Sequence, residues 1–290
     1  MTIRHLQIFI AVADCGRMRA AAEQLYISQP SVSQAIRELE QYYDVKLFER
    51  LNQRIYITES GRKLLSYARH IVDSLDECEQ ELKKDKVHPL IRLGSSVSVG
   101  TVLLDDYLNL YEVEIPQADV RVTVNNTAQI EGLLLTNQLD LAIVEGSIDS
   151  DELIQIEVAE DELFLVVGRR HPYYENPNIT LDQLNGQALI SREEGSHDRN
   201  QYERLLRDKG IHMEKKWSCT NVQAIINSVM AGRGIGILSN LLIADELRSG
   251  ELRMLNIDDI HIRRKLRLVY HKNKYLTDAM QQFIHICTEN

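Results

Sequence analysis

The first forty residues carry hydrophobic side chains at helical spacing. Between Leu6 and Ala13 these side chains recur at intervals of three and four, which predicts a first amphipathic helix that ends at Gly16. A second short helix is expected from Met18 to Leu25. A third is expected from Ser28, a good N-cap, to about Tyr42. The pattern thus predicts three helices, the last two joined by a tight turn.

The third helix has one hydrophobic stripe, formed by Val32, Ile36 and Leu39, and one polar face. The outward residues of that face are Ser31, Ser33, Gln34, Arg37 and Glu38. Gln and Arg can each make two hydrogen bonds to a base edge, so this face suits recognition in the major groove of DNA. Taken alone, the periodicity fits a helical hairpin with a solvated polar face equally well.

The stretch after the third helix favours DNA binding over the plain hairpin. Leu47 and Phe48 form a hydrophobic anchor, and residues 49–57 then alternate around a polar tip, as the strands of a β-wing do. Arg50 and Arg54 are then expected beside the phosphates of the DNA backbone.

A single long helix is predicted next, from Thr58, which can cap it, to Pro89, which ends it. Hydrophobic or small residues follow one another there at alternating steps of four and three: Leu64, Ala68, Ile71, Leu75, Cys78 and Leu82. Such a heptad seam is typical of a coiled coil and predicts that two copies of the chain pair through this helix. The alternative is a single helix packed on its own domain.

From Leu90 onward the pattern changes to strands that alternate with helices. Strands are expected first at residues 90–95, 120–125 and 139–144, and then at 163–168, 188–191, 216–219, 235–238 and 265–270. The chain is expected to leave a first lobe near Glu160 and Asp161 and to return to it near Leu268. The second half is therefore predicted to be an α/β domain of two lobes.

Polar residues follow the carboxyl ends of these strands, where sheets of this kind bind ligands. The candidate ligand contacts are Ser96, Ser98, Asn126, Thr127, Glu145, Ser196, His197 and Asn221. Most lie at expected helix starts, whose free N–H groups favour an anion or a carboxylate. The alternative is that the Ser, Thr and Asn side chains only cap helices.

The charge is divided unequally along the chain. The net charge of the 290 residues is -10, yet residues 1–69 carry 10 Lys and Arg against 7 Asp and Glu, and the remainder carries 23 against 36. A mildly basic head on an acidic body can hold a phosphate backbone with the head alone. No leader-like N-terminus and no apolar run near the roughly 18 residues of a membrane span stand out, which predicts a cytoplasmic protein.

The cysteines and glycines indicate little further chemistry. Cys15, Cys78, Cys219 and Cys287 lie far apart and lack metal-ligand spacing, which favours reduced thiols over a metal site. The stretch 232–236, Gly-Arg-Gly-Ile-Gly, lacks the spacing of a dinucleotide-binding motif. No nucleophile–base or metal constellation stands out, so neither an enzyme nor a bound cofactor is expected.

The head resembles the DNA-binding domain of LysR-type transcriptional regulators. The resemblance rests on the motifs "SQPSVSQAI", "LFER" and "ITESG" at these spacings. It implies a winged helix-turn-helix at residues 1–58, a dimerisation helix at 59–88 and an effector-binding domain at 89–290. The candidate DNA contacts are Ser28, Gln29, Pro30, Ser31, Ser33, Gln34, Arg37, Arg50 and Arg54.

The rest of the chain resembles the effector-binding domain of the same family, which is itself similar to periplasmic binding proteins. The stretches concerned are "IRLGSSVSVG", "NNTAQIEGLLLTNQLDLAIVEG", "ISREEGSHDR" and "VMAGRGIGILS". They imply a lobe I at about 90–160 and 269–290 and a lobe II at about 161–268. Many relatives have Gly-Ser-Gly-Thr-Arg where residues 195–199 here are Gly-Ser-His-Asp-Arg, a departure that bears on the ligand contacts expected there.

The expected function is sequence-specific regulation of transcription without catalysis, controlled by a small effector bound between two α/β lobes. The expected partners are double-stranded DNA, the effector and a second copy of the chain, with a homotetramer implied by the resemblance. RNA polymerase is a further candidate partner, and a membrane is not. The alternatives are an enzyme with a regulatory DNA-binding head and a redox-sensing regulator of the same family that uses Cys219 and Cys287.

Overall fold

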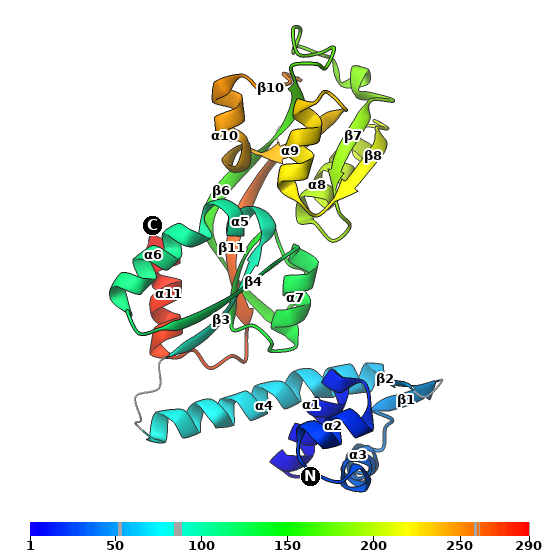
Figure 1. Ribbon diagram of the computed structural model, residues 1–290, viewed down its shortest axis with the longest axis vertical. Helices are drawn as coiled ribbons and strands as arrows, with labels where there is room; N and C mark the ends of the chain where they lie inside the picture. Colours follow the sequence, from blue (N-terminus) through cyan, green and yellow to red (C-terminus); the bar gives the residue numbers. More distant parts are fainter. Residues whose placement is uncertain (52–53, 84–88, 258–259, 261, 290) are drawn as a thin grey trace. The chain divides into compact units, whose positions relative to one another are not determined.

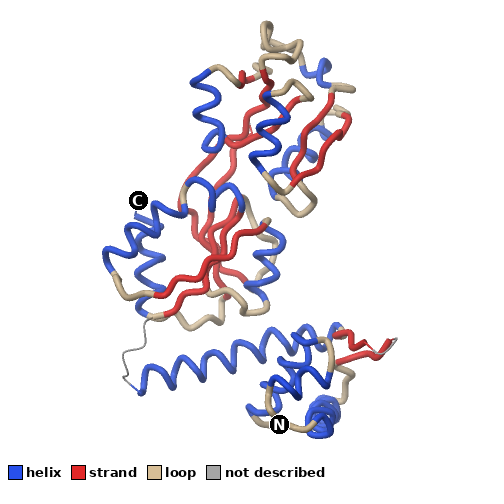
Figure 2. The backbone as a smooth tube through the Cα atoms, viewed as in Figure 1, coloured by secondary structure: helices blue, strands red, loops and turns tan. Residues whose placement is uncertain are grey.

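The computed structural model describes residues 1–51, 54–83, 89–257, 260 and 262–289, and the chain forms two compact units (Figures 1 and 2). The first unit comprises Met1–Val87 with the short segments Leu135–Gln138 and Asn273–Tyr275. The second comprises the rest of the chain. No helix among the described residues combines the length and the apolarity that a bilayer crossing requires.

The first unit is a helical head with a β-hairpin and a long helix. Its elements are α1 (Ile3–Cys15), α2 (Met18–Gln24), α3 (Gln29–Tyr43), β1 (Phe48–Leu51), β2 (Arg54–Ile57) and α4 (Glu59–Lys83). Phe9, Val12 and Val32 are fully buried in its core, and Phe48 anchors the hairpin against the ring of Phe9. The predicted winged helix-turn-helix fold is confirmed.

Local sequence signals set the helix ends in this head. Gly16 ends α1 in the left-handed region, with φ of 62°. The Ser28 hydroxyl accepts a hydrogen bond from the Ser31 N–H at 3.2 Å and so caps α3. The Thr58 hydroxyl accepts from the Gly61 N–H at 3.0 Å at the start of α4. These caps place the polar face of α3 on the outside of the head.

The long helix α4 uses the predicted seam in two different ways. Ala68 is fully buried and Leu64 half-buried, and both pack on the core of their own head. Further along, Ile71 is 45% exposed and Leu75 38%, and Cys78 is exposed. The side chain of Leu82 lies outside the described residues. The predicted seam is therefore wrong at Leu64 and Ala68, because their own head covers these two residues. At Ile71, Leu75 and Cys78 the seam is exposed and open to a partner.

The second unit contains two lobes that share one mixed sheet. Lobe I holds β3 (Leu90–Ser96), α5 (Val97–Val102), α6 (Leu104–Glu114), β4 (Asp119–Asn125), α7 (Thr127–Leu135), β5 (Leu141–Glu145) and α11 (Asp278–Glu289). Its core brings α6 and α11 onto the sheet, where the rings of Tyr111 and Phe283 meet edge to face at 5.4 Å.

Lobe II begins on the far half of β6 (Leu153–Gly168) and ends on β11 (Ile262–His271). Between them lie a short 3-10 helix (Leu181–Leu184), β7 (Ala188–Arg192), α8 (His197–Asp208), β8 (Glu214–Cys219), α9 (Val222–Met230), β9 (Ile235–Ser239), α10 (Asn240–Ser249) and β10 (Leu252–Met254). The strand order across both lobes is β4-β3-β5-β11-β6-β9-β7-β8, with β10 beside β6. The predicted two-lobed α/β architecture is confirmed.

Two long antiparallel strands, β6 and β11, carry the chain between the lobes (Figure 1). On β6 the chain passes from the lobe I side at Ala159 to the lobe II core at Leu163. On β11 it passes from Ile262 in the lobe II core to Leu266 in the lobe I core. The return thus comes just before Leu266, slightly earlier than the expected position near Leu268, because β11 pairs with β6 across the crossing, with Ile262 beside Leu163 and Leu266 beside Ala159.

Candidate DNA-binding and ligand-binding sites

One exposed strip of α3 gathers most of the predicted DNA contacts. Ser28, Gln29, Pro30, Ser31, Gln34 and Arg37 are all exposed along the N-terminal half of this helix, and Ser33 is half-buried beside them. The Gln29 amide donates to the Ser33 hydroxyl at 3.0 Å, and the hydroxyls of Ser28 and Ser31 lie 2.8 Å apart. The strip therefore offers hydroxyl, amide and guanidinium groups on one side of the helix.

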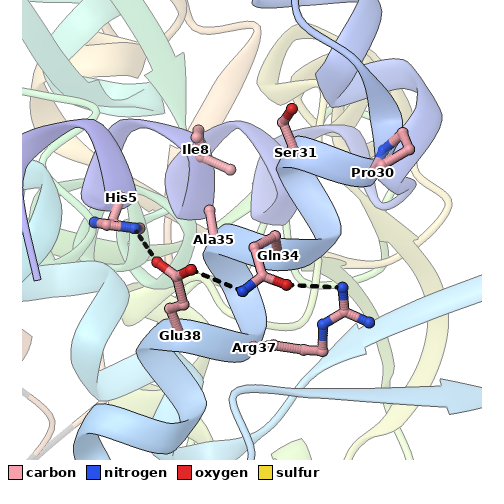
Figure 3. A pocket seen from close by; sticks show the side chains of 8 residues that line it. All are labelled: His5, Ile8, Pro30, Ser31, Gln34, Ala35, Arg37 and Glu38. Atoms are coloured by element: carbon pink, nitrogen blue, oxygen red, sulfur yellow. Dashed lines mark hydrogen bonds and ion pairs between the residues drawn. The ribbon is translucent and has the colours of Figure 1, made fainter.

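A chain of hydrogen bonds crosses from α1 to this strip (Figure 3). Nε2 of His5 lies 2.9 Å from Oε2 of Glu38. Nε2 of Gln34 donates to the other Glu38 oxygen at 2.7 Å, and the Arg37 guanidinium donates to Oε1 of Gln34 at 3.0 Å. These four side chains line an open groove of about 520 Å³ that Ile8, Pro30, Ser31 and Ala35 complete.

The wing of the head is only partly described. Arg50 pairs with Ile55, and Arg54 with Leu51, in the β1–β2 ladder. The side chains of Arg50 and Arg54 lie outside the described part of the chain. Their expected contact with DNA phosphates stays a prediction.

A buried polar cluster lies between the two lobes, and Glu145 of lobe I stands at its centre. Glu145 ends β5 and is 4% exposed. Its carboxylate accepts the backbone N–H of Ser98 at 3.2 Å and lies 3.4 Å from the Thr127 hydroxyl. The hydroxyls of Ser96 and Ser98 are buried and make no hydrogen bond of normal geometry with a described residue. Four predicted ligand contacts thus meet here.

Arg264 of β11 joins this cluster to lobe II. Its guanidinium donates to Asp161 at 2.8 Å and to Asp198, and lies 3.8 Å from Glu145. All four side chains are at least nine-tenths buried. Arg192 approaches Asp198 at 3.9 Å. Three carboxylates therefore surround one guanidinium at the level where the chain crosses between lobes.

The ionisation of the cluster follows from its burial and its partners. Burial opposes the charge of Glu145, yet Arg264 and the nearby serine hydroxyls hold the pKa of its carboxyl below the ordinary value. Burial raises the pKa of Asp198, and Arg264 offsets this only in part. Burial also lowers the pKa of His197, which keeps its imidazole neutral at pH 7.

His197 brings lobe II against lobe I at one close contact. A Cβ added to Gly146, which has φ of +74°, would lie 1.9 Å from Nε2 of the His197 ring. A glycine is therefore needed at the end of β5, and the ring covers the backbone there. The departure from the family pattern at residues 195–199 thus places both His197 and Asp198 at the boundary between lobes.

The other predicted ligand contacts have different environments. Asn221 is exposed, and its side chain accepts from the Ala224 N–H at 3.1 Å, so it caps α9. Asn126 accepts from the Gln129 N–H at 3.0 Å at the start of α7. Ser196 is buried at the start of α8 without a side-chain cap bond. For Asn221 the capping interpretation therefore accounts for the side chain.

Sequence inspection missed the charged part of the interlobe cluster. The predicted strands stop one or two residues short of Asp161, Arg192 and Arg264, and no sequence motif links these three residues. Asp161 and Arg264 are 103 residues apart and become neighbours only through the β6–β11 register. Glu38 was likewise predicted only as an outward residue of the third helix, and no signal in the sequence linked it to His5. The sequence alone does not reveal the register in which β6 pairs with β11, and this register brings the charged residues together.

The two cysteines of the redox alternative pack in different cores. Cys287 is fully buried in the lobe I core, where burial raises the pKa of its thiol to about 12. Cys219 packs at the lobe II core, and all four cysteines are free. Because the thiolate is the reactive form, Cys287 is a poor candidate for oxidation. The Cys219–Cys287 switch gains no support.

Comparison with protein families gives two matches that together span nearly the whole chain. The family described as "Bacterial regulatory helix-turn-helix protein, lysR family" matches residues 3–62. The family described as "LysR substrate binding domain" matches residues 84–290.

Curated relatives match along nearly the whole of this chain and most of their own length. The chain is 30% identical over 287 residues to the uncharacterized HTH-type transcriptional regulator YeiE of Escherichia coli, covering 99% of this chain and 97% of that protein. It is 32% identical over 291 residues to a probable RuBisCO transcriptional regulator of Nostoc, covering 97% and 86%.

Solved structures share the fold. ArgP from Mycobacterium tuberculosis has a TM-score of 0.78 at 18% identity and covers 98% of this chain and 95% of its own. LysG from Corynebacterium glutamicum, with bound effector Arg, has a TM-score of 0.72 at 17% identity and covers 100% and 97%. At these identities the likeness supports the architecture alone.

Proposed function

The chain belongs to the LysR family of transcriptional regulators, and from this premise we propose how it recognises DNA and its effector. The α3 strip contacts base edges in the major groove, and a small polar molecule bound between the lobes controls this contact. Members of the family bind DNA and effectors and form oligomers, and no enzyme family is indicated. A tetramer and a contact with RNA polymerase stay predictions.

The observation that supports DNA recognition is the composition of the exposed strip on α3. Gln34 and Arg37 project from successive turns of the helix and lie next to each other, with their side chains joined by a hydrogen bond. An amide and a guanidinium in this position can each make paired contacts with one base edge. Ser31 and Ser33 add hydroxyls that can bind bases or phosphates.

Replacing Arg37 with alanine tests this assignment. We expect the preference of the full-length protein for a duplex selected from a randomised pool, measured against a scrambled duplex, to fall about 5- to 150-fold, the equivalent of roughly 1–3 kcal/mol. Arg54→Ala should instead weaken both duplexes alike, because phosphates carry no sequence information. An unchanged preference in Arg37→Ala, measured by competition in fluorescence anisotropy, contradicts the assignment.

The observation that supports effector binding between the lobes is the pair of buried serine hydroxyls beside Glu145, which lie close enough to its carboxylate to lower its pKa but lack a partner of normal hydrogen-bond geometry among the described residues. A buried polar group without a partner costs free energy, roughly 1–3 kcal/mol, unless another molecule satisfies it. Ser96 and Ser98, at 1% exposure each, have the Glu145 carboxylate nearby but no partner of normal hydrogen-bond geometry among the described residues. Glu145 already accepts the Ser98 N–H at the start of α5 and lies beside the Thr127 hydroxyl at the start of α7. A plain anion would therefore meet a buried negative charge.

The effector that fits best carries a hydrogen-bond donor next to an acceptor group. A hydroxyl or amino group would donate to Glu145, and a neighbouring carboxylate or phosphate would accept from the serine hydroxyls. This refines the anion expected from the sequence, since the carboxylate of Glu145 now sets a requirement for a donor.

A thermal-shift screen distinguishes an effector that carries a hydrogen-bond donor from a plain anion. Hydroxy acids and amino acids should include compounds that raise the melting temperature of the full-length protein, whereas sulfate and acetate should not. A ligand at 100 times its Kd adds about 2.7 kcal/mol, or about 5–10 °C for a domain of this size. Ser98→Ala and Glu145→Gln should abolish the shift, and Asn221→Ala, at an exposed cap, should keep it. A plain anion that shifts the parent and depends on Ser98 contradicts the donor requirement.

A further inference from the structure

A histidine on α1 connects to the DNA-binding face of α3. We propose that His5 is a positioning residue for DNA recognition, which fixes the side chains of Gln34 and Arg37 through Glu38 before DNA arrives. The proposal rests on the proposed role of α3 and assigns His5 no contact with a base. It is carried by three consecutive hydrogen bonds that join the half-buried His5 to the exposed side chains of Glu38, Gln34 and Arg37 (Figure 3).

The tautomer of His5 is set by the start of α1. The backbone N–H of Thr2 donates to Nδ1 of His5 at 3.1 Å, and the Thr2 hydroxyl accepts from the His5 N–H in return. This is a capping box with His in place of the usual Glu or Gln. Because a backbone N–H can only donate, Nδ1 must accept. The ring proton therefore lies on Nε2, which donates to Glu38.

Glu38 is the junction between the two helices. One carboxylate oxygen accepts from His5 at 2.9 Å, and the other accepts from Gln34 at 2.7 Å. The hydrogen bonds from Gln34 and His5 lower the pKa of Glu38, so its carboxyl stays an acceptor. A carboxylate held at both oxygens has little freedom to turn toward the phosphates, where it would repel DNA.

The junction also fixes which way the Gln34 amide points. Its nitrogen faces Glu38, and its oxygen accepts from Arg37 at 3.0 Å. An amide has two N–H groups and two acceptor positions. Glu38 and Arg37 use one of each, so one N–H and one acceptor position of Gln34 remain for a base. That pair is what bidentate contact with an adenine edge requires. A side chain held in this orientation loses less conformational entropy when it binds a base.

The network is too exposed to add much to the stability of the head, which favours a role in recognition. The side chains of His5 and Glu38 are 21% and 46% exposed. Exposed pairs of this kind typically add little or nothing measurable to the free energy of unfolding. The buried core of the head, around Phe9 and Val32, does not depend on them.

Two substitutions of His5 separate positioning from capping. Glutamine at this place keeps both functions, since its oxygen can accept from Thr2 and its amide can donate to Glu38. Glutamate keeps the cap but cannot donate to Glu38 and repels it. We expect His5→Gln to retain the preference for the selected over the scrambled duplex within about twofold, and His5→Glu to reduce it about five- to tenfold. Anisotropy competition measures both.

A double-mutant cycle shows whether His5 acts through Gln34. In the Gln34→Ala background, His5→Glu should cause no further loss of preference. Glu38→Ala, which leaves the cap untouched, should reproduce the loss and should not add to His5→Glu. Thermal unfolding of each variant shows whether the head is folded. If His5→Glu does not fold, Glu38→Ala still tests the proposal.

The outcomes separate the two proposals. If Gln34→Ala itself leaves the preference unchanged, the proposed role of α3 is wrong. If Gln34→Ala lowers the preference but His5→Glu lowers it equally in both backgrounds, or His5→Gln is as harmful as His5→Glu, then positioning by His5 is wrong and the role of α3 stands. Loss of affinity for both duplexes without loss of preference also overturns positioning.

Discussion

Replacing Arg264 with methionine should destabilise the second unit by about 3–5 kcal/mol. Methionine fills similar space but leaves Glu145, Asp161 and Asp198 buried without the guanidinium that they surround. Removing one partner of a buried ion cluster leaves uncompensated charge, which costs this much in other proteins. For a unit of about 200 residues the melting temperature should fall by about 6–20 °C. Trp217, the sole tryptophan, lies in this unit and reports its unfolding by fluorescence.

The pH dependence of this loss identifies charge as its cause. In the parent the pKa of Glu145 is lowered, so its contribution to stability is present above the unfolded value and lost as pH falls. Without Arg264, burial raises that pKa instead, and the variant gains stability relative to the parent as the pH falls and the carboxyls take up protons. The difference should be larger at pH 8 than at pH 5.

Arg248→Met provides the matched control for this substitution. Arg248 pairs with Asp245 on α10, but both side chains are about four-fifths exposed, so this change should cost less than about 0.5 kcal/mol. An equal loss for Arg264→Met at pH 8 and pH 5 would indicate lost packing and not stranded charge.

The head was largely predictable because its signals are local. Gly16, Ser28 and Thr58 each act within three or four residues of their own position, and the end of α1, both ends of α2 and α3 and the start of α4 lie within two residues of those expected. The hydrogen-bond chain on its surface was not predictable. His5 and Glu38 lie 33 residues apart, and only the packing of α1 against α3 brings them together.

The sensor site was predictable at the level of strand ends and not at the level of its charges. Ser96, Ser98, Thr127 and Glu145 follow three strands of a parallel arrangement, so a single edge gathers them. Asp161 lies in the middle of β6 and Arg264 near the start of β11, where the hydrophobic alternation gives no sign of a buried ion pair. Their meeting depends on the register of β6 and β11.

The linker helix shows how one sequence pattern can serve two partners. A repeat of four and three describes any helix side that is covered continuously, whatever covers it. Here α1 and the core of the head cover Leu64 and Ala68. Ile71, Leu75 and Cys78 extend the same side of α4 beyond the core of the head and are exposed. The sequence could not show at which residue of α4 the contact with the head ends and the side open to a second copy begins.

Replacing Leu75 with aspartate should separate the subunits and abolish tight operator binding. We expect Ile71, Leu75 and Cys78 to pack against the same residues of a second copy, where an unpaired carboxylate would be buried at high cost. Two linked heads bind two half-sites with an avidity that exceeds either alone by about 10²–10⁴, so affinity for a selected palindromic duplex should fall by that order. Light scattering should show the lower mass.

Ser74→Asp serves as the control for Leu75→Asp, because it adds the same charge at an exposed position beside the seam and should keep both mass and affinity. Binding to a single half-site should be alike in parent and Leu75→Asp, since each head keeps its own core. A Leu75→Asp protein of unchanged mass would mean that the exposed side of α4 pairs with nothing in solution. A lower mass with full operator affinity would mean that pairing through α4 does not couple the two heads.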